Sequence, residues 1–241
     1  MNQKKAKKSI NFIIITIILI LFMIPFFVLV INTFKTTAEF TTAPFSLPTS
    51  FKLDNYILAI KRMDFFNALK NTAIITVLAV ALNTLVATMT GYLFARKQWK
   101  LNKIIFMAFL ASMVAPFQVY MIPLVKIYGG TFGMSNNLLL VSIIAAGLNI
   151  PFAVFLYHGF IKGIPEELDE AARIDGCNFA RTYFNIILPL LKPIIITVVV
   201  FVALGTWNDY LMSSLFLTKM ETRTLAIATQ TFLSNHTAEY A

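Results

Sequence analysis

INFIIITIILILFMIPFFVLVI, residues 10–31, is an unbroken apolar stretch without a charged side chain. At 1.5 Å of rise per residue, it would extend roughly 33 Å as an α-helix. The hydrocarbon core of a bilayer is about 30 Å thick, so the stretch predicts a transmembrane helix. It is too long for the apolar region of a cleaved signal peptide, which has about 7–15 residues. We therefore expect it to remain in the protein as a membrane anchor.

Four further apolar runs follow, at residues 71–95, 104–127, 137–158 and 190–217. The whole chain is 58% hydrophobic and only 13% charged, whereas soluble domains have about 25% charged residues. Its mean hydropathy of +0.76 is also far above the soluble range. This composition excludes an ordinary soluble protein and predicts an all-α fold, a polytopic membrane helical bundle with five spans.

The basic residues predict how the chain is oriented. Four lysines lie in the tail 1–9, and the turn RKQWKLNK at 96–103 carries four more basic side chains. Short basic segments stay in the cytoplasm, which places the N-terminus inside the cell membrane. The loop 159–189 is then cytoplasmic, and the segments 32–70 and 218–241 are external. The net charge of +9 thus reflects topology, and we expect membrane lipid and no nucleic acid as a partner.

The acidic residues are concentrated in one place. EELDEAARIDG, residues 166–176, holds five of the eleven acidic side chains. Pro165 suits a helix start and Gly176 a helix end, which predicts a short helix over 165–175. Within it, Asp169 and Arg173 have the spacing of an i, i+4 ion pair, whereas Glu166 and Glu170 repel each other at that spacing. A partner that presents basic side chains would relieve the repulsion.

The spacing around this helix carries a family resemblance. Glu170, Ala171 and Ala172 are followed by three residues and Gly176, and nine residues later by IILP at 186–189. This pattern resembles the EAA motif of binding-protein-dependent ABC transporter permeases. LKNTAIITVL, GYLFARKQWKLNK and GTWNDYL also occur in the order expected of carbohydrate-importer permeases. The chain is most similar to the maltose-type second permease subunit.

The resemblance implies a transport role without catalysis by this chain. Residues 71–217 would form the permease core, and the acidic loop would be a coupling helix that docks in a cytoplasmic ATP-binding cassette ATPase dimer. A second permease subunit would complete the path, and an extracellular solute-binding protein would deliver the sugar. The residues of the motif expected to couple to the ATPase are Glu167, Glu170, Ala171, Ala172, Asp175, Gly176, Leu188 and Pro189.

We expect no cofactor on this chain, and ATP and Mg on the partner ATPase. None of its nine glycines begins a P-loop, so it is not expected to be an enzyme. His158 and His236 are far apart in the sequence and do not indicate a metal site. Cys177 is the only cysteine, which excludes an intrachain disulfide.

Polar residues within the spans are candidates for the translocation path, because ionisable and polar groups are costly in a bilayer. Sugars are bound by hydrogen-bonding groups and aromatic faces, and the WND sequence offers both. Hydrogen bonds between helices are the alternative role for each of these residues. The candidates are Asn83, Gln118, Tyr120, Asn149, Trp207, Asn208 and Asp209.

Other interpretations remain open at this point. The solute could be something other than a sugar, or the chain could be a truncated, non-functional permease, because the usual sixth span is expected beyond Ala241. An ion-driven secondary transporter would show inverted repeats and a membrane-embedded ion site. The EAA loop argues against an ion-driven secondary transporter, because it resembles a loop that couples to an ATPase.

Overall fold

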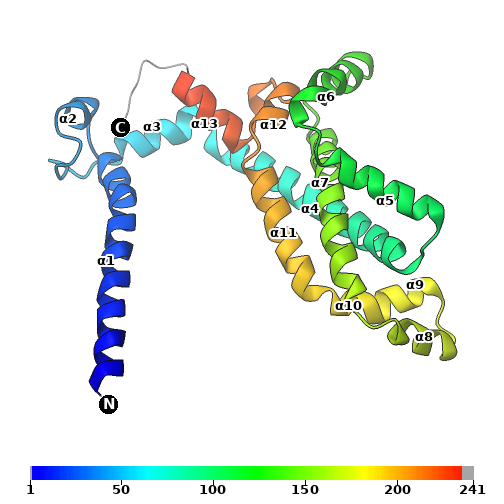
Figure 1. The fold of residues 1–241 in the computed structure, drawn as a ribbon. Helices are drawn as coiled ribbons and strands as arrows, with labels where there is room; N and C mark the ends of the chain where they lie inside the picture. The colour runs from blue at the N-terminus through cyan, green and yellow to red at the C-terminus, as the bar shows by residue number, and fades with distance from the viewer. Residues whose placement is uncertain (1, 235–241) are drawn as a thin grey trace. The chain divides into compact units, whose positions relative to one another are not determined.

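The structure is a computed structural model that describes residues 2–234, and over this range it contains helices and no strand. The all-α prediction is therefore confirmed for the described part of the chain. Figure 1 shows the helices as a ribbon. The chain divides into two units. One unit comprises the residues up to Phe65 together with those from Gln230 onward. The other comprises Phe66–Thr229.

The first unit contains α1 (Asn2–Asn32), α2 (Thr37–Thr42) and α3 (Asp54–Arg62). Most apolar side chains of α1 from Ile10 to Val30 are exposed, as expected for a helix that lipid or a partner surrounds, and Val28 is half-buried. The turn after α1 is held by Lys35, whose Nζ donates to the carbonyls of Ala43 and Pro44 at 3.0 and 3.1 Å.

The core of the second unit is built on α4 (Phe65–Arg96), α7 (Leu138–Lys162) and α11 (Lys192–Trp207). Helix α4 crosses α7 where Gly91 meets Tyr157, and a β-carbon on Gly91 would lie 2.8 Å from the Tyr157 Cβ. Small residues allow such close approach of helices in membranes. The buried side chains around this crossing include Ala87, Ala153, Val154, Ile161, Ile187, Leu191, Val198 and Val202.

Two of the apolar runs are bent rather than straight. Helix α5 (Lys100–Ser112) and the helical stretch Phe117–Thr131, which comprises α6 (Phe117–Leu124) and a π-helix, meet at 98°. Pro116 precedes α6, lacks an N–H donor and disfavours helix at the residue before it, which explains the break. Hydropathy alone predicts one continuous segment over 104–127.

The last apolar run is also divided. The stretch Phe179–Leu190, which contains α9 (Phe179–Thr182), a π-helix and α10 (Leu188–Leu190), meets α11 at 77°. Helix α11 ends at Trp207, and the separate helix α12 (Leu211–Phe216) follows it. The described chain therefore has three long apolar helices, and up to five spans if each bent pair counts as one.

The segment after α12 is tied to the rest of its unit by asparagine side chains. Asn136 has a positive φ of 61°. Its Oδ1 accepts from the Lys219 backbone N–H at 2.8 Å and from the Thr222 hydroxyl at 3.0 Å. Asn71 of α4 donates to the carbonyls of Glu221 and Arg223 at 2.9 and 3.0 Å. A 3₁₀ turn (Met220–Thr222) and α13 (Leu225–Ser234) lie in the segment that we predicted as an external tail.

Candidate functional site

The acidic segment folds into α8 (Glu167–Ile174), slightly shorter than the helix predicted over 165–175. Its first turn contains three carboxylates, which the positive end of the helix dipole favours. Gly176 ends the helix with φ +81°, a conformation that side chains disfavour. Its N–H donates to the Arg173 carbonyl at 3.0 Å, and the Cys177 N–H donates to the Ala172 carbonyl at 2.9 Å. This pair of bonds is a Schellman motif, so the predicted role of Gly176 as a helix end is confirmed.

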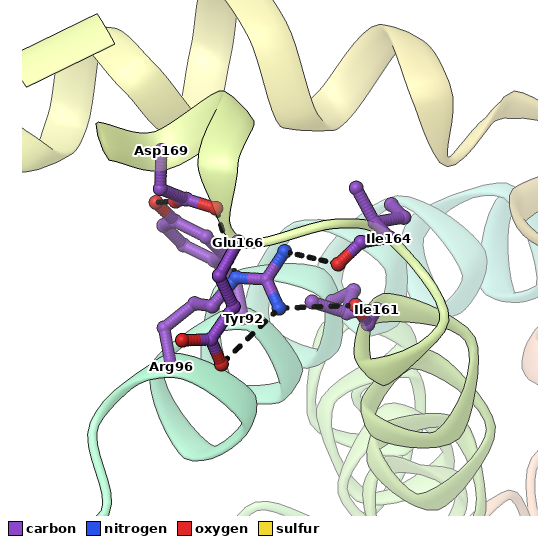
Figure 2. Close-up of polar contacts among 6 residues, drawn as sticks. All are labelled: Tyr92, Arg96, Ile161, Ile164, Glu166 and Asp169. Carbon is purple, nitrogen blue, oxygen red and sulfur yellow. Dashed lines mark hydrogen bonds and ion pairs between the residues drawn. The ribbon is translucent and has the colours of Figure 1, made fainter. Parts of the chain in front are cut away.

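Asp169 of α8 is 4% exposed and points into the protein. The Tyr92 hydroxyl donates to its Oδ1. The Arg96 Nε donates to its Oδ2 at 2.9 Å, as Figure 2 shows. Both partners come from the last two turns of α4, so one buried carboxylate fastens α8 to the end of that helix. The predicted pair with Arg173 is wrong, because the Asp169 carboxylate faces α4 and Arg173 lies exposed.

Arg96 also joins α4 to the end of α7. Its Nη1 donates to the Ile161 carbonyl at 3.2 Å, and its Nη2 donates to the Ile164 carbonyl at 2.9 Å. Glu166 lies 3.9 Å from Nη1, so the guanidinium also offsets the repulsion between Glu166 and Glu170 (Figure 2). The planar guanidinium suits this role, because it presents its donors in several directions at once. We call Tyr92, Arg96 and Asp169 the α4–α8 clamp.

Aromatic packing holds α9 to the same end of α4. The Tyr92 and Phe179 rings are stacked, with centroids 4.6 Å apart. Thr88 and Tyr183 share a hydrogen bond of 2.7 Å between their hydroxyls. The Lys97 ammonium lies 5.6 Å from the centre of the Phe179 ring, a cation–π contact. The helices on both sides of Gly176 are therefore fixed to α4.

The structure separates the predicted motif residues into two groups. Glu167, Glu170, Ala171, Asp175 and Gly176 are exposed, as is Pro189 of α10, whereas Ala172 is buried and Leu188 is half-buried. Ile174, at the end of α8, is 86% exposed. A single exposed apolar side chain is common on protein surfaces, so Ile174 alone does not identify a binding surface. We call Glu167, Glu170, Ala171 and Ile174 the exposed face of α8.

Sequence reasoning missed Tyr92 and Arg96 as functional candidates. In the sequence, Arg96 is only one of the basic residues that predict topology, and Tyr92 is only one residue of the GYLFARKQWKLNK stretch. A charged residue at the end of an apolar run was the available signal. Its partner lies 73 positions away in the sequence, and no periodicity connects residues so far apart.

The candidate path residues in α4 and α7 have partners inside the helix bundle. Asn83 is buried and donates to the Ala146 carbonyl at 3.2 Å. Asn149 is half-buried and donates to the Ala145 carbonyl of its own helix at 2.9 Å. A role in the translocation path stays a prediction for both residues.

The remaining path candidates lie near helix ends. Asp209 accepts from the backbone N–H and the hydroxyl of Ser213 at 2.8 and 2.7 Å, so it caps α12. Asn208 is exposed and donates to the Leu204 carbonyl at 2.8 Å, and Trp207 is 37% exposed. In α6, Gln118 is exposed and Tyr120 packs edge-on against Phe117. Within residues 2–234, the hydrogen bonds of these candidates go to other partners and do not join the candidates to one another or to Asn83.

The described residues also contain no group of three or more His, Cys, Asp or Glu side chains placed to hold a metal ion. The hydrogen bonds of the site connect α8 mechanically to the core helices. The exposed face of α8 is linked through the buried Asp169 to a long apolar helix, and through Arg96 to a second one.

Comparison with known proteins gives one family. Residues 87–238 match the family described as "Binding-protein-dependent transport system inner membrane component". A relative from Thermoanaerobacterium thermosulfurigenes, the "Probable starch degradation products transport system permease protein AmyC", is 41% identical over 221 residues, which are 92% of this chain and 80% of the relative. The "Melibiose/raffinose/stachyose import permease protein MelC" of Bacillus subtilis is 33% identical over 214 residues, 88% of this chain and 77% of the relative.

A solved structure has the same fold. It is described as a bacterial ABC transporter involved in the import of the acidic polysaccharide alginate. The match has a TM-score of 0.81 at 18% identity and covers 100% of this chain and 85% of that one. The predicted fold, a helical bundle of the ABC importer permease kind, is thus confirmed.

Proposed function

This chain belongs to the family of binding-protein-dependent transport system inner membrane components, and we propose that it forms one half of the path by which a sugar or oligosaccharide enters the cell. It is a multi-pass membrane protein and a permease subunit of an ABC importer. Such an importer contains a second permease subunit, an ATPase and a solute-binding protein. ATP and Mg are assigned to the ATPase partner.

The names of the relatives support a carbohydrate as the solute. One is named for starch degradation products and another for melibiose, raffinose and stachyose. The exposed Trp207 and Asn208 have the chemistry that binds a sugar, an aromatic face beside a hydrogen-bonding amide. These two residues are the first candidates for contact with the solute.

The α4–α8 clamp is the observation that carries the coupling proposal. ATP-driven closure of the ATPase would displace the exposed face of α8. Because Asp169 is buried and bonded to both Tyr92 and Arg96, α8 cannot shift without moving the end of α4 or breaking charged hydrogen bonds. The Arg96 bonds to the Ile161 and Ile164 carbonyls pass the same displacement to α7. Two core helices would then tilt together and switch the cavity between inward-facing and outward-facing states.

The proposed orientation places α8 in the cytoplasm. Arg96 and Lys97 belong to the basic turn that predicts the cytoplasmic side, and both contact the segment that carries α8 and α9. The basic turn and the acidic helix therefore lie at one end of the second unit. This agrees with an ATPase that binds on the side where the basic turn lies.

A cross-linking experiment tests the proposal. In a Cys177→Ser background, a cysteine replaces Ala171 on α8, and membranes that contain the whole importer are treated with a short bifunctional reagent. We expect a cross-link to the ATPase. A cysteine at the exposed Lys219, which is predicted to be external, is the matched control and should give none. Absence of the Ala171 cross-link, or an equal one from Lys219, would reject the assignment.

A charge reversal tests the function of the same face. Glu170→Lys should leave membrane insertion intact, because Glu170 is exposed. We expect it to separate ATP hydrolysis from uptake in reconstituted vesicles. Uptake at the wild-type rate would contradict the proposed role of this face.

A further inference from the structure

A second feature of the same end of the molecule has no role in the coupling proposal. It is a cavity of about 480 Å³ enclosed by the ends of α4 and α7 and the start of α5. Small-molecule sites usually have volumes of about 300–1,000 Å³. Three lysines, Lys97, Lys103 and Lys162, are among the residues that line it. Its remaining wall includes Phe106 and Met107.

The positive charge of the lysines in this cavity is not balanced by a carboxylate in the cavity wall. Its lining residues are all within the described part of the chain, and none of them is a carboxylate. Two of the five carboxylates in the adjacent segment 166–176, those of Glu166 and Asp169, face Arg96. Three lysines along one concave surface without a carboxylate therefore favour an anion, and phosphate groups are ordinary partners of lysine.

The other half of the cavity is apolar. The His158 ring lies against the Phe106 ring, with centroids 4.1 Å apart, and Met107 is exposed beside them. Leu101 and Ile104 of α5 are exposed as well and add apolar surface to the same helix. A free phosphate ion would leave this surface unused, whereas the acyl chains of a lipid would cover it.

The position of the cavity also suits a lipid headgroup. Arg96 is the last residue of α4 and Lys162 the last of α7, so the amines lie where two long apolar helices end. Polar headgroups occupy that level of a bilayer. Basic pockets between helices on the cytoplasmic side are suited to anionic lipid headgroups.

We propose that this cavity is a binding site for the phosphate headgroup of an anionic phospholipid in the cytoplasmic leaflet. The assignment to the cytoplasmic leaflet depends on the orientation proposed above, whereas the assignment of the binding site does not. Lys103 and Lys162 would bind the phosphate, and α5 would contact the acyl chains. Lys97 also contacts Phe179 of α9, so the bound lipid would lie beside the elements that hold α8 to α4.

The test is lipid binding by the purified full-length chain, measured by native mass spectrometry from micelles supplied with phosphatidylglycerol or phosphatidylcholine. We expect one tightly bound phosphatidylglycerol and no matching phosphatidylcholine. Lys103→Gln with Lys162→Gln should weaken phosphatidylglycerol binding about 30-fold, since each lysine near an anionic headgroup contributes roughly a factor of five. Lys103→Arg with Lys162→Arg should retain most of the binding.

The matched control is Lys100→Gln with Lys192→Gln. These two exposed lysines lie at helix starts in the same unit and outside the cavity. Their replacement by glutamine removes the same total charge as the double variant in the cavity. We expect less than a threefold change. An equal loss in both double variants, or equal binding of the two lipids, would overturn the proposal. So would displacement of the lipid by millimolar inorganic phosphate, because the site would then bind a free anion.

The binding measurement needs neither the ATPase nor transport, so it can fail while the proposed function stands. If the variant Lys103→Gln with Lys162→Gln does not fold, Lys162→Gln alone can be compared with the wild type in the same way. We then expect phosphatidylglycerol binding to weaken about fivefold.

Discussion

Removal of the Asp169 carboxylate should release α8 from α4. In Asp169→Ala, the Arg96 guanidinium loses its buried acceptor while its side chain stays 4% exposed. Removing one partner of a buried ion pair typically costs about 3–5 kcal/mol. Arg96 would retain the Ile161 and Ile164 carbonyls and the Glu166 carboxylate at 3.9 Å. We therefore expect the lower end of the range, ~3 kcal/mol.

The assay is amide hydrogen exchange of residues 167–177, followed by mass spectrometry of the chain in nanodiscs. A loss of ~3 kcal/mol corresponds to roughly a 100-fold increase in the opened population, because 1.4 kcal/mol is a factor of ten. Peptides from α11 should exchange as before. Glu170→Ala removes an exposed carboxylate from the same helix and should change the free energy of opening by no more than about 0.5 kcal/mol.

A double variant separates the ion pair from the packing. Replacing both partners, as in Arg96→Met with Asp169→Leu, should restore much of the protection, because apolar pairs of similar volume often replace buried ion pairs without loss. Exchange in Asp169→Ala within about threefold of wild type would show that α8 is held by other contacts. Equal exchange in Asp169→Ala and Glu170→Ala would refute the clamp altogether.

Three further substitutions test particular parts of the fold. Gly91→Ala places a β-carbon 2.8 Å from the Tyr157 Cβ and should destabilise the bundle by about 1–3 kcal/mol in detergent unfolding. In the control Gly147→Ala, the added β-carbon has no other atom within 4 Å, so this variant should not destabilise the bundle. Equal losses of stability in the two variants would disprove the close crossing of α4 and α7. Gly176→Ala should cost about 1–2 kcal/mol at φ +81° and speed exchange only at the end of α8, and unchanged exchange there would contradict the Schellman end. Asn136→Ala removes the acceptor for Lys219 and Thr222 and should speed exchange across 217–224, whereas unaltered protection would mean that other bonds hold this segment.

The sequence predicts the helical class and the end of α8 for physical reasons that act locally. Apolar runs must be helical in a bilayer, because no water is there to bond the backbone. A glycine after a short amphipathic segment supplies the left-handed conformation that ends a helix, and Gly176 has it. Such effects depend on neighbours in the sequence, and a single chain is enough to recognise them.

A proline in an apolar run can mark a bend, but neither the angles of the bends nor the α4–α8 clamp could be predicted in the same way. Pro116 in a run of apolar residues is compatible with a kinked continuous helix or with a full break, and only packing decides between them. Asp169 has a local partner of suitable charge in Arg173, yet the structure pairs it with Arg96 across 73 positions. That choice depends on where α7 places the start of α8 relative to the end of α4, which no pattern in the sequence reveals.

The α4–α8 clamp should make α8 and the end of α4 move as one body when the ATPase closes. Spin labels on cysteines at Ala171 and at the exposed Met89 of α4, in a Cys177→Ser background, measure the distance between the two helices in the complete importer by pulsed electron resonance. The clamp predicts the same mean distance and width with and without ATP, while a label at Ala171 changes its distance from one on the second permease subunit. A shift or broadening of the distance between the labels at Ala171 and Met89 on ATP addition would contradict the account.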